Sequence, residues 1–357
     1  MKRIITFLLS LFALDSSTAQ TPAELVQKYG KAFPQYTELA FAVIEGDEVS
    51  FYGFIKKDST FETKDNANAI FEVGSITKVF TSTLLADQVV NKKMKLNQLV
   101  KKSLPFKLKG NPKITLASLS NHSSGLPRLP DNIFAMMVNN PDNPYKGYNE
   151  EKLKEYCTKQ LSLKGTIGKQ SDYSNLGAGL LGYAICQETQ KSYEELLQET
   201  IFKPLKMPQT TTNRSLVEEQ LIRGLDPKGK VTSNWDLEVL ASAGNVLSSV
   251  QDLSKFMIAN FDRQNPVFQL QQTKTISINK NMAVALGWHI IKTKTGKKLH
   301  WHNGGTGGYT SSMAIDVEHK KGVVILSNLS AFHRKTGNID ALVFKLMETL
   351  EAGSEEE

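Results

Sequence analysis

Strand-forming segments lie at both ends of this chain, and a long, mostly helical stretch separates them. Residues 39–44 and 49–55 are two β-rich runs around Glu45-Gly46-Asp47-Glu48, a sequence typical of a hairpin turn. Further β-rich runs follow near the C-terminus, at 285–292, 298–302, 311–317 and 323–328. Because short strands are not stable alone, the two ends must meet in one sheet.

The sequence between these ends favours helices. Residues 75–90 carry apolar side chains at helical spacing, with Gly74 and Ser75 at the start, which predicts a long buried helix. Further helices are expected at 150–160, 176–188, 193–199, 249–261 and 338–350. The predicted fold class is α/β (α+β): an antiparallel β-sheet flanked by helices, with an inserted all-helical region.

The same pattern predicts the domain organisation. The sheet-containing domain is expected to combine residues 20–94 with 262–350, and the mainly helical domain to span 95–261. Residues 351–357 are expected to form a solvated acidic tail.

The first residues are typical of a secretory signal peptide. Lys2 and Arg3 precede an apolar run over residues 4–14, and small and polar residues lead to Ala19. The run is shorter than the about 20 residues that span a bilayer, so cleavage after Ala19 is favoured over a retained anchor. We therefore expect a secreted or periplasmic protein with no integral membrane span after cleavage.

The composition argues against several classes of function. The 43 basic and 36 acidic residues are spread along the chain rather than gathered in a basic stripe, so no nucleic-acid partner is expected. Two cysteines, Cys157 and Cys186, are too few for a zinc ribbon or an iron–sulfur site. The six histidines occur without a metal-ligand spacing, so neither a metal nor another cofactor is expected. The sequence leaves open the oligomeric state and whether the two cysteines are bonded.

Two glycine-rich matches carry no nucleotide chemistry. Residues 177–182 have the G-x-G-x-x-G spacing but follow no strand, so close helix packing explains them better. Residues 224–230 have the spacing of a phosphate-binding loop, but Pro227 interrupts it and Val231 stands where magnesium needs a hydroxyl. This second segment is expected to be a turn.

Ser75 and Lys78 are candidate catalytic residues. A serine becomes a nucleophile when a base accepts its proton, and a lysine three residues later lies on the same face of a helix. Burial at the start of an apolar helix would also favour neutral lysine. A second S-x-x-K copy at 277–280 lies in a polar stretch and is interpreted as chance. Taken singly, Ser75 could be only a helix cap.

Companion residues follow in chain order. Tyr173 is a candidate for relaying a proton to the leaving group, and Asn175 for holding a substrate amide carbonyl. Later, His302, Asn303, Gly304 and Gly305 end a strand and run into more glycines, which allow a substrate close to the backbone. The backbone N–H groups of Ser75 and Gly305 are candidates for an oxyanion hole.

Together these motifs resemble the penicillin-recognising serine hydrolases, in their class C β-lactamase-like branch. The resemblance covers nearly all of the mature chain and rests on residues 71–78, 119–127, 173–177, 243–249 and 302–308. It implies a β-lactamase/transpeptidase-like fold with a site between sheet and helices, where Ser75 is acylated. His122, in the second motif, is interpreted as structural.

One departure bears on the substrate. The family's β-lactamases usually carry Lys-Thr-Gly where this chain has His302-Asn303-Gly304. A neutral histidine anchors a carboxylate more weakly than a lysine, although a protonated one could serve. Residues 126–132, 140–145 and 301–305 look most like the D-alanyl-D-alanine carboxypeptidase/endopeptidases. The expected partner is thus a cell-wall peptide or a β-lactam-like small substrate; a β-lactamase, an esterase and a non-turnover penicillin-binding sensor are the alternatives.

Overall fold

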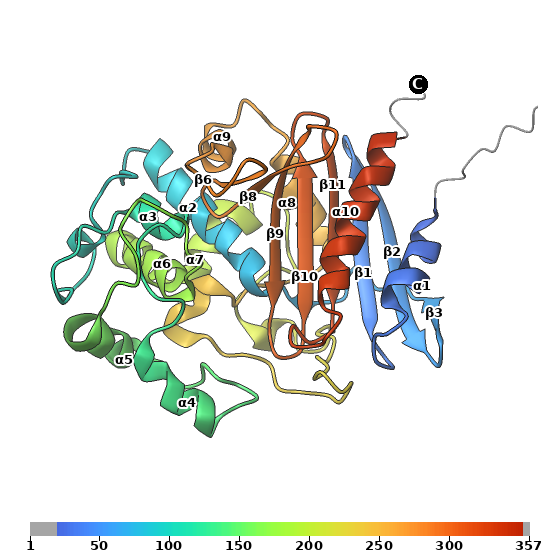
Figure 1. Ribbon diagram of the computed structural model, residues 1–357, viewed down its shortest axis with the longest axis horizontal. Coiled ribbons are helices and arrows are strands. Elements are labelled where there is room, and N and C mark those ends of the chain that lie inside the picture. The colour runs from blue at the N-terminus through green and yellow to red at the C-terminus, as the bar shows by residue number, and fades with distance from the viewer. Residues whose placement is uncertain (1–19, 353–357) are drawn as a thin grey trace, which may run out of the picture.

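The computed structural model describes residues 20–352 and contains one large sheet with helices on both faces (Figure 1). The strands are β1 (Glu38–Glu45), β2 (Glu48–Lys57), β3 (Thr60–Thr63), β4 (Phe71–Glu72), β5 (Leu247–Ser248), β6 (Ile276–Ser277), β7 (Met282–Val284), β8 (His289–Lys292), β9 (Lys298–Gly305), β10 (Thr310–Asp316) and β11 (Lys321–Ser327). The helices are α1 (Pro22–Gly30), α2 (Thr77–Val90), α3 (Leu116–Ser120), α4 (Phe134–Asn139), α5 (Glu150–Glu155), α6 (Asn175–Thr189), α7 (Tyr193–Leu197), α8 (Val250–Ala259), α9 (Pro266–Gln272) and α10 (Gly337–Ala352). Shorter helical segments are η1 (Gly74–Ile76), η2 (Val100–Lys102), η3 (Asp131–Ile133), η4 (Tyr156–Gln160), η5 (Gln198–Phe202), η6 (Arg214–Leu216) and η7 (Glu238–Ala243).

The two ends of the chain pair in one sheet, as the sequence predicts. Its strand order is β3-β2-β1-β11-β10-β9-β8-β7-β6, and the pairs are antiparallel. The link is β1 with β11, where Phe41 lies opposite Ile325. The N-terminal hairpin thus adds to an edge that the C-terminal strands would otherwise leave unpaired.

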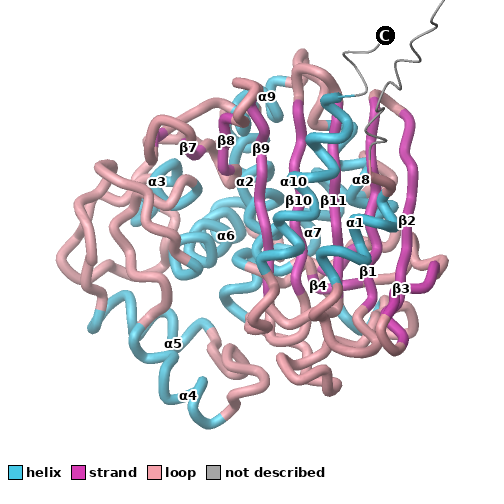
Figure 2. The backbone as a smooth tube through the Cα atoms, turned by 45° about the vertical axis from the view of Figure 1, so that its right-hand side comes forward, coloured by secondary structure: helices cyan, strands magenta, loops and turns pink. Residues whose placement is uncertain are grey.

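Alternating side chains on the strands serve two hydrophobic cores. In β1, Leu39 and Phe41 pack with helices α1 and α10 on one face, whereas Ala40, Ala42 and Ile44 belong to the larger core on the other. Figure 2 shows α1 and α10 lying along the strands. Both faces of β1 are therefore buried, which explains its nearly continuous apolar sequence.

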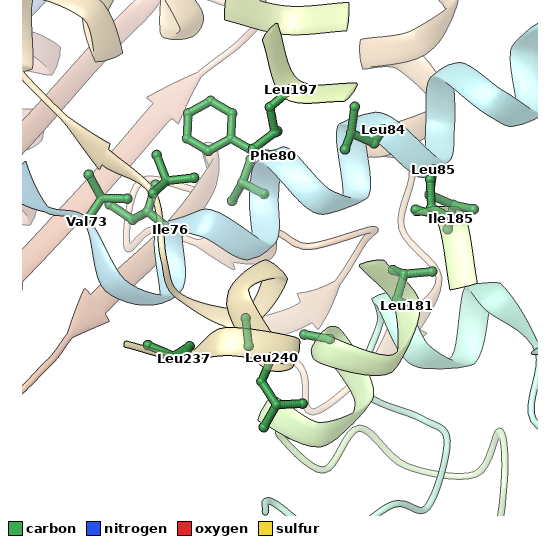
Figure 3. Close-up of a cluster of buried hydrophobic side chains, with 14 of the residues drawn as sticks. Val73, Ile76, Phe80, Leu84, Leu85, Leu181, Ile185, Leu197, Leu237 and Leu240 are labelled. Atoms are coloured by element: carbon green, nitrogen blue, oxygen red, sulfur yellow. The ribbon is translucent and has the colours of Figure 1, made fainter. Parts of the chain in front are cut away.

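Helix α2 is buried on almost all sides, because it runs through the larger core. Figure 3 shows its side chain Leu85 next to Ile185 of α6, and Phe80 next to Leu197 of α7. Helix α6 in turn packs against η7, where a Cβ atom on Gly179 would lie only 2.3 Å from a methyl carbon of Leu240. The glycines at 177–182 thus serve helix packing, as predicted.

Most predicted elements are confirmed, and one strand is corrected. Of the predicted strand at 285–292, only residues 289–292 form a strand, β8; residues 285–288 form the turn that joins it to β7, in which Ala285 N–H donates to Trp288 O at 2.9 Å. Gly287 in this turn has φ +72°, and a Cβ atom there would lie 2.7 Å from the carbonyl oxygen of Lys78. The chain therefore bends here because its backbone passes directly against α2.

Helix α1 was not predicted, although its start carries a recognisable signal. Thr21 and Glu24 form a capping box ahead of it. The predicted signal peptide and the end of the predicted acidic tail lie outside the described residues, and the division into a sheet domain and a helical domain stays a prediction. In residues 20–352, no helix has the length and apolar character needed to cross a membrane.

Candidate active site

Ser75 lies in η1, a 3₁₀ turn that leads directly into α2. The turn is fixed against the sheet because Ser311 Oγ–H of β10 donates to Val73 O at 2.8 Å. Gly74 adopts φ +51°, a conformation that favours glycine. Ser75 is half-buried and lines a cavity between the sheet and the helices.

Lys78 lies one turn further along, next to Ser75. Its Nζ is 2.9 Å from Ser75 Oγ and 2.6 Å from the carbonyl oxygen of Ala243 in η7. The side chain is 2% exposed, and no carboxylate among residues 20–352 pairs with it. Burial, with a contribution from the charge of Arg128, holds the pKa of Lys78 well below its usual range. The environment therefore favours the neutral amine, which can accept a proton.

Tyr173 approaches the same serine from the segment before α6. Its Oη–H donates to Ser75 Oγ at 2.6 Å. Its ring lies 4.7 Å from Lys78 Nζ and 4.5 Å from the His122 ring, centre to centre. Burial raises the pKa of Tyr173, so the phenol keeps its proton at neutral pH. The structure thus brings Ser75, Lys78 and Tyr173 together, and their catalytic roles stay a prediction.

His122 supports the segment that carries Tyr173. Its Nδ1 accepts from Ser174 N–H at 3.3 Å, and its carbonyl oxygen accepts from Asp172 N–H at 2.7 Å. Burial holds the pKa of His122 well below its usual range. This geometry agrees with the structural interpretation of His122.

Asn175 is the first residue of α6 and lines the cavity. Its Nδ2–H donates to Tyr145 Oη at 3.0 Å, which fixes the direction of the amide. Its Oδ1 is buried and has no hydrogen-bond partner in the described part of the chain. A peptide N–H group of a ligand would satisfy this oxygen. Within the described residues one of the two N–H bonds of the amide donates, to Tyr145, so the other can donate to the substrate carbonyl expected at Asn175.

Glycines let β9 pass directly against the turn that carries Ser75. A Cβ atom on Gly304 would lie 2.1 Å from Val73 O and 2.7 Å from the Ser75 backbone nitrogen. A Cβ atom on Gly74 would lie 2.6 Å from the Gly305 nitrogen. Side chains are therefore excluded at this contact, and the two proposed oxyanion donors lie on neighbouring backbones.

The structure separates His302 from Asn303. Neighbouring residues of a strand point to opposite faces, and Asn303 lines the cavity while His302 does not. His302 is 2% exposed, lies with its ring centre 5.4 Å from that of His289, and its Nδ1 is 2.6 Å from the carbonyl oxygen of Asn303. Burial holds the pKa of His302 well below its usual range, which favours the neutral ring over the protonated anchor.

The cavity has a volume of about 680 Å³. Side chains that sequence reasoning did not assign to the site make up much of its wall; they include Arg128, Met137, Tyr145, Trp235, His289, Phe332 and Asp340. Asp340 lies in the first turn of α10 and accepts from Asn303 Nδ2–H at 2.9 Å. These residues come from separate loops and helices. A sequence signal existed for Arg128 and Tyr145, which lie within the segments 126–132 and 140–145 that resemble the carboxypeptidase/endopeptidases.

The other sequence motifs and the two cysteines do not contribute to this cavity. The second S-x-x-K copy lies at the hairpin of β6 and β7, and residues 226–230 form a turn in which Gly229 N–H donates to Asp226 O at 2.9 Å. Cys157 and Cys186 are free thiols. In the described range 20–352, no three His, Cys, Asp or Glu side chains are grouped so that they could hold a metal ion.

A comparison with protein families gives one match that covers most of the chain. The family model described as Beta-lactamase matches residues 26–345. Among curated proteins, the chain is 28% identical over 335 residues to D-alanyl-D-alanine-carboxypeptidase/endopeptidase AmpH of Escherichia coli K12, which covers 87% of this chain and 85% of that protein. It is 25% identical to Protein flp of Staphylococcus aureus MW2 over 78% of this chain and 56% of that protein.

Solved structures agree in fold. A β-lactamase/D-alanine carboxypeptidase from Pseudomonas syringae superposes with a TM-score of 0.74 at 20% identity, covering 92% of this chain and 98% of that one. The octameric penicillin-binding protein homologue from Pyrococcus abyssi gives a TM-score of 0.73 at 24% identity, covering 92% and 75%. At these identities the likeness establishes the shared arrangement of sheet and helices.

Proposed function

The chain belongs to the beta-lactamase family of serine hydrolases, and from this premise we propose that it is an exported enzyme that cleaves amide bonds in D-amino-acid peptides of the cell wall. The observation that carries the proposal is the convergence of Lys78 Nζ and Tyr173 Oη on Ser75 Oγ, at 2.9 and 2.6 Å. The 28% identity to the carboxypeptidase/endopeptidase AmpH supports the substrate class.

In the proposed first step, Ser75 attacks the carbonyl carbon of the D-residue. Neutral Lys78 accepts the hydroxyl proton as the new C–O bond forms. The negative charge that develops on the carbonyl oxygen is stabilised by the backbone N–H groups of Ser75 and Gly305. Ala243 O, at 2.6 Å, holds Lys78 Nζ in place for this transfer.

The leaving amine then departs with a proton. Tyr173 donates its proton to the amine nitrogen as the C–N bond breaks, and Lys78 returns the serine proton to Tyr173, so an ester on Ser75 and a neutral amine remain. A water molecule enters the cavity and the same groups act in reverse. The ester is hydrolysed to a carboxylic acid, and Ser75 recovers its hydroxyl group.

Asn175 is proposed to bind the donor segment of the peptide, which is the part on the acyl side of the scissile bond. Its buried Oδ1 accepts no hydrogen bond within the described residues and can accept one from a substrate N–H group. The apolar side chains of the cavity, including Met137, Trp235 and Phe332, offer contact area beyond the scissile bond. Export is proposed from the signal-like sequence at residues 1–19.

Labelling and turnover of one purified sample test the proposal. The mature protein should form a covalent adduct with a fluorescent penicillin at Ser75 and release D-alanine from a peptide that ends in D-Ala-D-Ala. Absence of both the adduct and D-alanine release would refute it. Faster turnover of nitrocefin or of a short nitrophenyl ester than of the peptide would favour the β-lactamase or esterase alternative, and a stable adduct without any turnover would indicate a sensor.

A further inference from the structure

The described wall of the cavity carries few charged groups. Among the described lining residues, Arg128 is the one that carries a guanidinium or ammonium group, and Asp340 is the one with a carboxyl group. Asp340 already accepts a hydrogen bond from Asn303. His302 of β9 and the neighbouring His289 do not supply the positive charge of the lysine in the family's Lys-Thr-Gly. Burial lowers the pKa of His289 to about 4 and that of His302 well below its usual range.

Arg128 is held in place, but its charge is not neutralised. Its carbonyl oxygen accepts from the N–H groups of Asn175 and Leu176, at 2.9 and 3.2 Å, which fixes the backbone at the start of α6. Its guanidinium carbon lies 5.0 Å from the centre of the Tyr173 ring. Within residues 20–352 this guanidinium forms neither an ion pair nor a hydrogen bond with another side chain. A planar donor fork stacked on an aromatic ring is preorganised to bind a carboxylate.

The position of Arg128 identifies which part of a substrate it meets. It lies beside Asn175, whose backbone N–H donates to the Arg128 carbonyl oxygen and whose amide contacts Tyr145, and all three residues line the cavity. Asn175 is the residue proposed above to hold the donor peptide. An anionic group bound by Arg128 therefore belongs to the donor segment, on the acyl side of the scissile bond.

We infer that Arg128 is a specificity-determining residue that binds a carboxylate carried by the donor segment of the peptide, close to the scissile D-residue. The inference rests on the proposed function and names its substrate class: D-amino-acid peptides with a free acidic side chain in the donor, rather than neutral peptides. A charge-assisted bidentate hydrogen bond at this partly exposed place would favour the acidic donor by about 10- to 100-fold.

Two isosteric peptides test this inference. Acetyl-Glu-D-Ala-D-Ala and acetyl-Gln-D-Ala-D-Ala differ in one charge on the donor side and release the same leaving group. For the wild type, kcat/KM should be about 10- to 100-fold higher for the Glu peptide, and this ratio should fall with added salt. In R128Q the ratio should approach one, in R128K it should be intermediate, and in R128E the Gln peptide should be preferred.

Other outcomes overturn the inference. If R128Q lowers kcat/KM for both peptides by the same factor, Arg128 acts on Tyr173 or on folding and not on the donor charge. If R128Q changes instead the preference between a free and an amidated C-terminal D-alanine, the carboxylate lies on the leaving-group side. Equal hydrolysis of both peptides by the wild type also contradicts it. Hydrolysis of neither peptide, together with no penicillin adduct, would instead refute the proposed function.

Discussion

The two walls of the cavity contribute to the site in different ways. The helical wall supplies side chains whose protonation is set by burial: Lys78 with a lowered pKa and Tyr173 with a raised one. The strand wall supplies mainly backbone, because Gly304 and Gly305 pass directly against the turn of Ser75. The helical wall thus depends on burial, which sets the protonation of its side chains. The strand wall depends on the absence of side chains, which lets its backbone approach Ser75. Variants of the two walls should therefore fail in different ways.

The largest effect is expected at the point where the walls meet. S75A should lower kcat/KM by about 10⁶-fold and abolish the penicillin adduct, because no other group can form the ester. Peptide hydrolysis and mass spectrometry measure both. The matched control is S277A in the second S-x-x-K copy, which should retain wild-type rates; loss of activity there would contradict the interpretation of that copy as chance.

On the helical wall, K78M should lower kcat/KM by about 10⁴-fold, because the proton of Ser75 loses its acceptor. The variant also reports the lowered pKa through stability. In the folded protein Lys78 is neutral at a pH where the unfolded chain still protonates it, so folding releases a proton. The unfolding free energy of the wild type should therefore rise relative to K78M between pH 7 and pH 10.

Urea denaturation at pH 7 and pH 9.5 measures this difference. A constant difference between wild type and K78M at both pH values would show that Lys78 is protonated in the folded state. The rate should agree with the same pKa: wild-type kcat/KM should decline only at a pH well below 10.5, as Lys78 becomes protonated.

Y173F tests the second group of the helical wall and should lower kcat/KM by about 10³-fold, since the leaving amine loses its proton donor. Its thermal stability should change little, because the ring and its contact with His122 remain. Substrates with leaving groups that need no proton, such as a nitrophenyl ester, should be affected least. An equal loss on ester and amide would argue against a role in leaving-group protonation.

The strand wall should fail through geometry. In G304A the new Cβ atom would lie 2.1 Å from Val73 O, so β9 or the turn of Ser75 must move. We expect a loss of about 10²-fold in kcat, comparable to the loss of an oxyanion donor, together with a lower melting temperature. G337A at the start of α10 is the matched control, since a Cβ atom there meets no heavy atom within 4 Å. A normal kcat in G304A would contradict the tight contact.

The sequence contains the information for the sheet and for the nucleophile because both arise from local patterns. β-rich runs on either side of a glycine-containing turn identify β1 and β2, and helical spacing identifies α2 with Ser75 and Lys78 on one face. The turn between β7 and β8 was missed because Gly287 bends the chain to fit against Lys78, which is a contact with a distant segment. Local propensity depends only on neighbouring residues in the sequence, so it does not predict such a contact.

By itself, therefore, the sequence determined the fold class, the pairing of its two ends and the residue types available for serine hydrolysis. The tertiary structure decided the protonation states of these side chains and which of them reach the cavity. Burial favours the neutral forms of Lys78 and His302, and the pleat of β9 turns Asn303 toward the cavity and His302 away from it. It also placed the guanidinium of Arg128 over the ring of Tyr173. These properties depend on desolvation and on distances between remote segments, which exist only after the chain has folded.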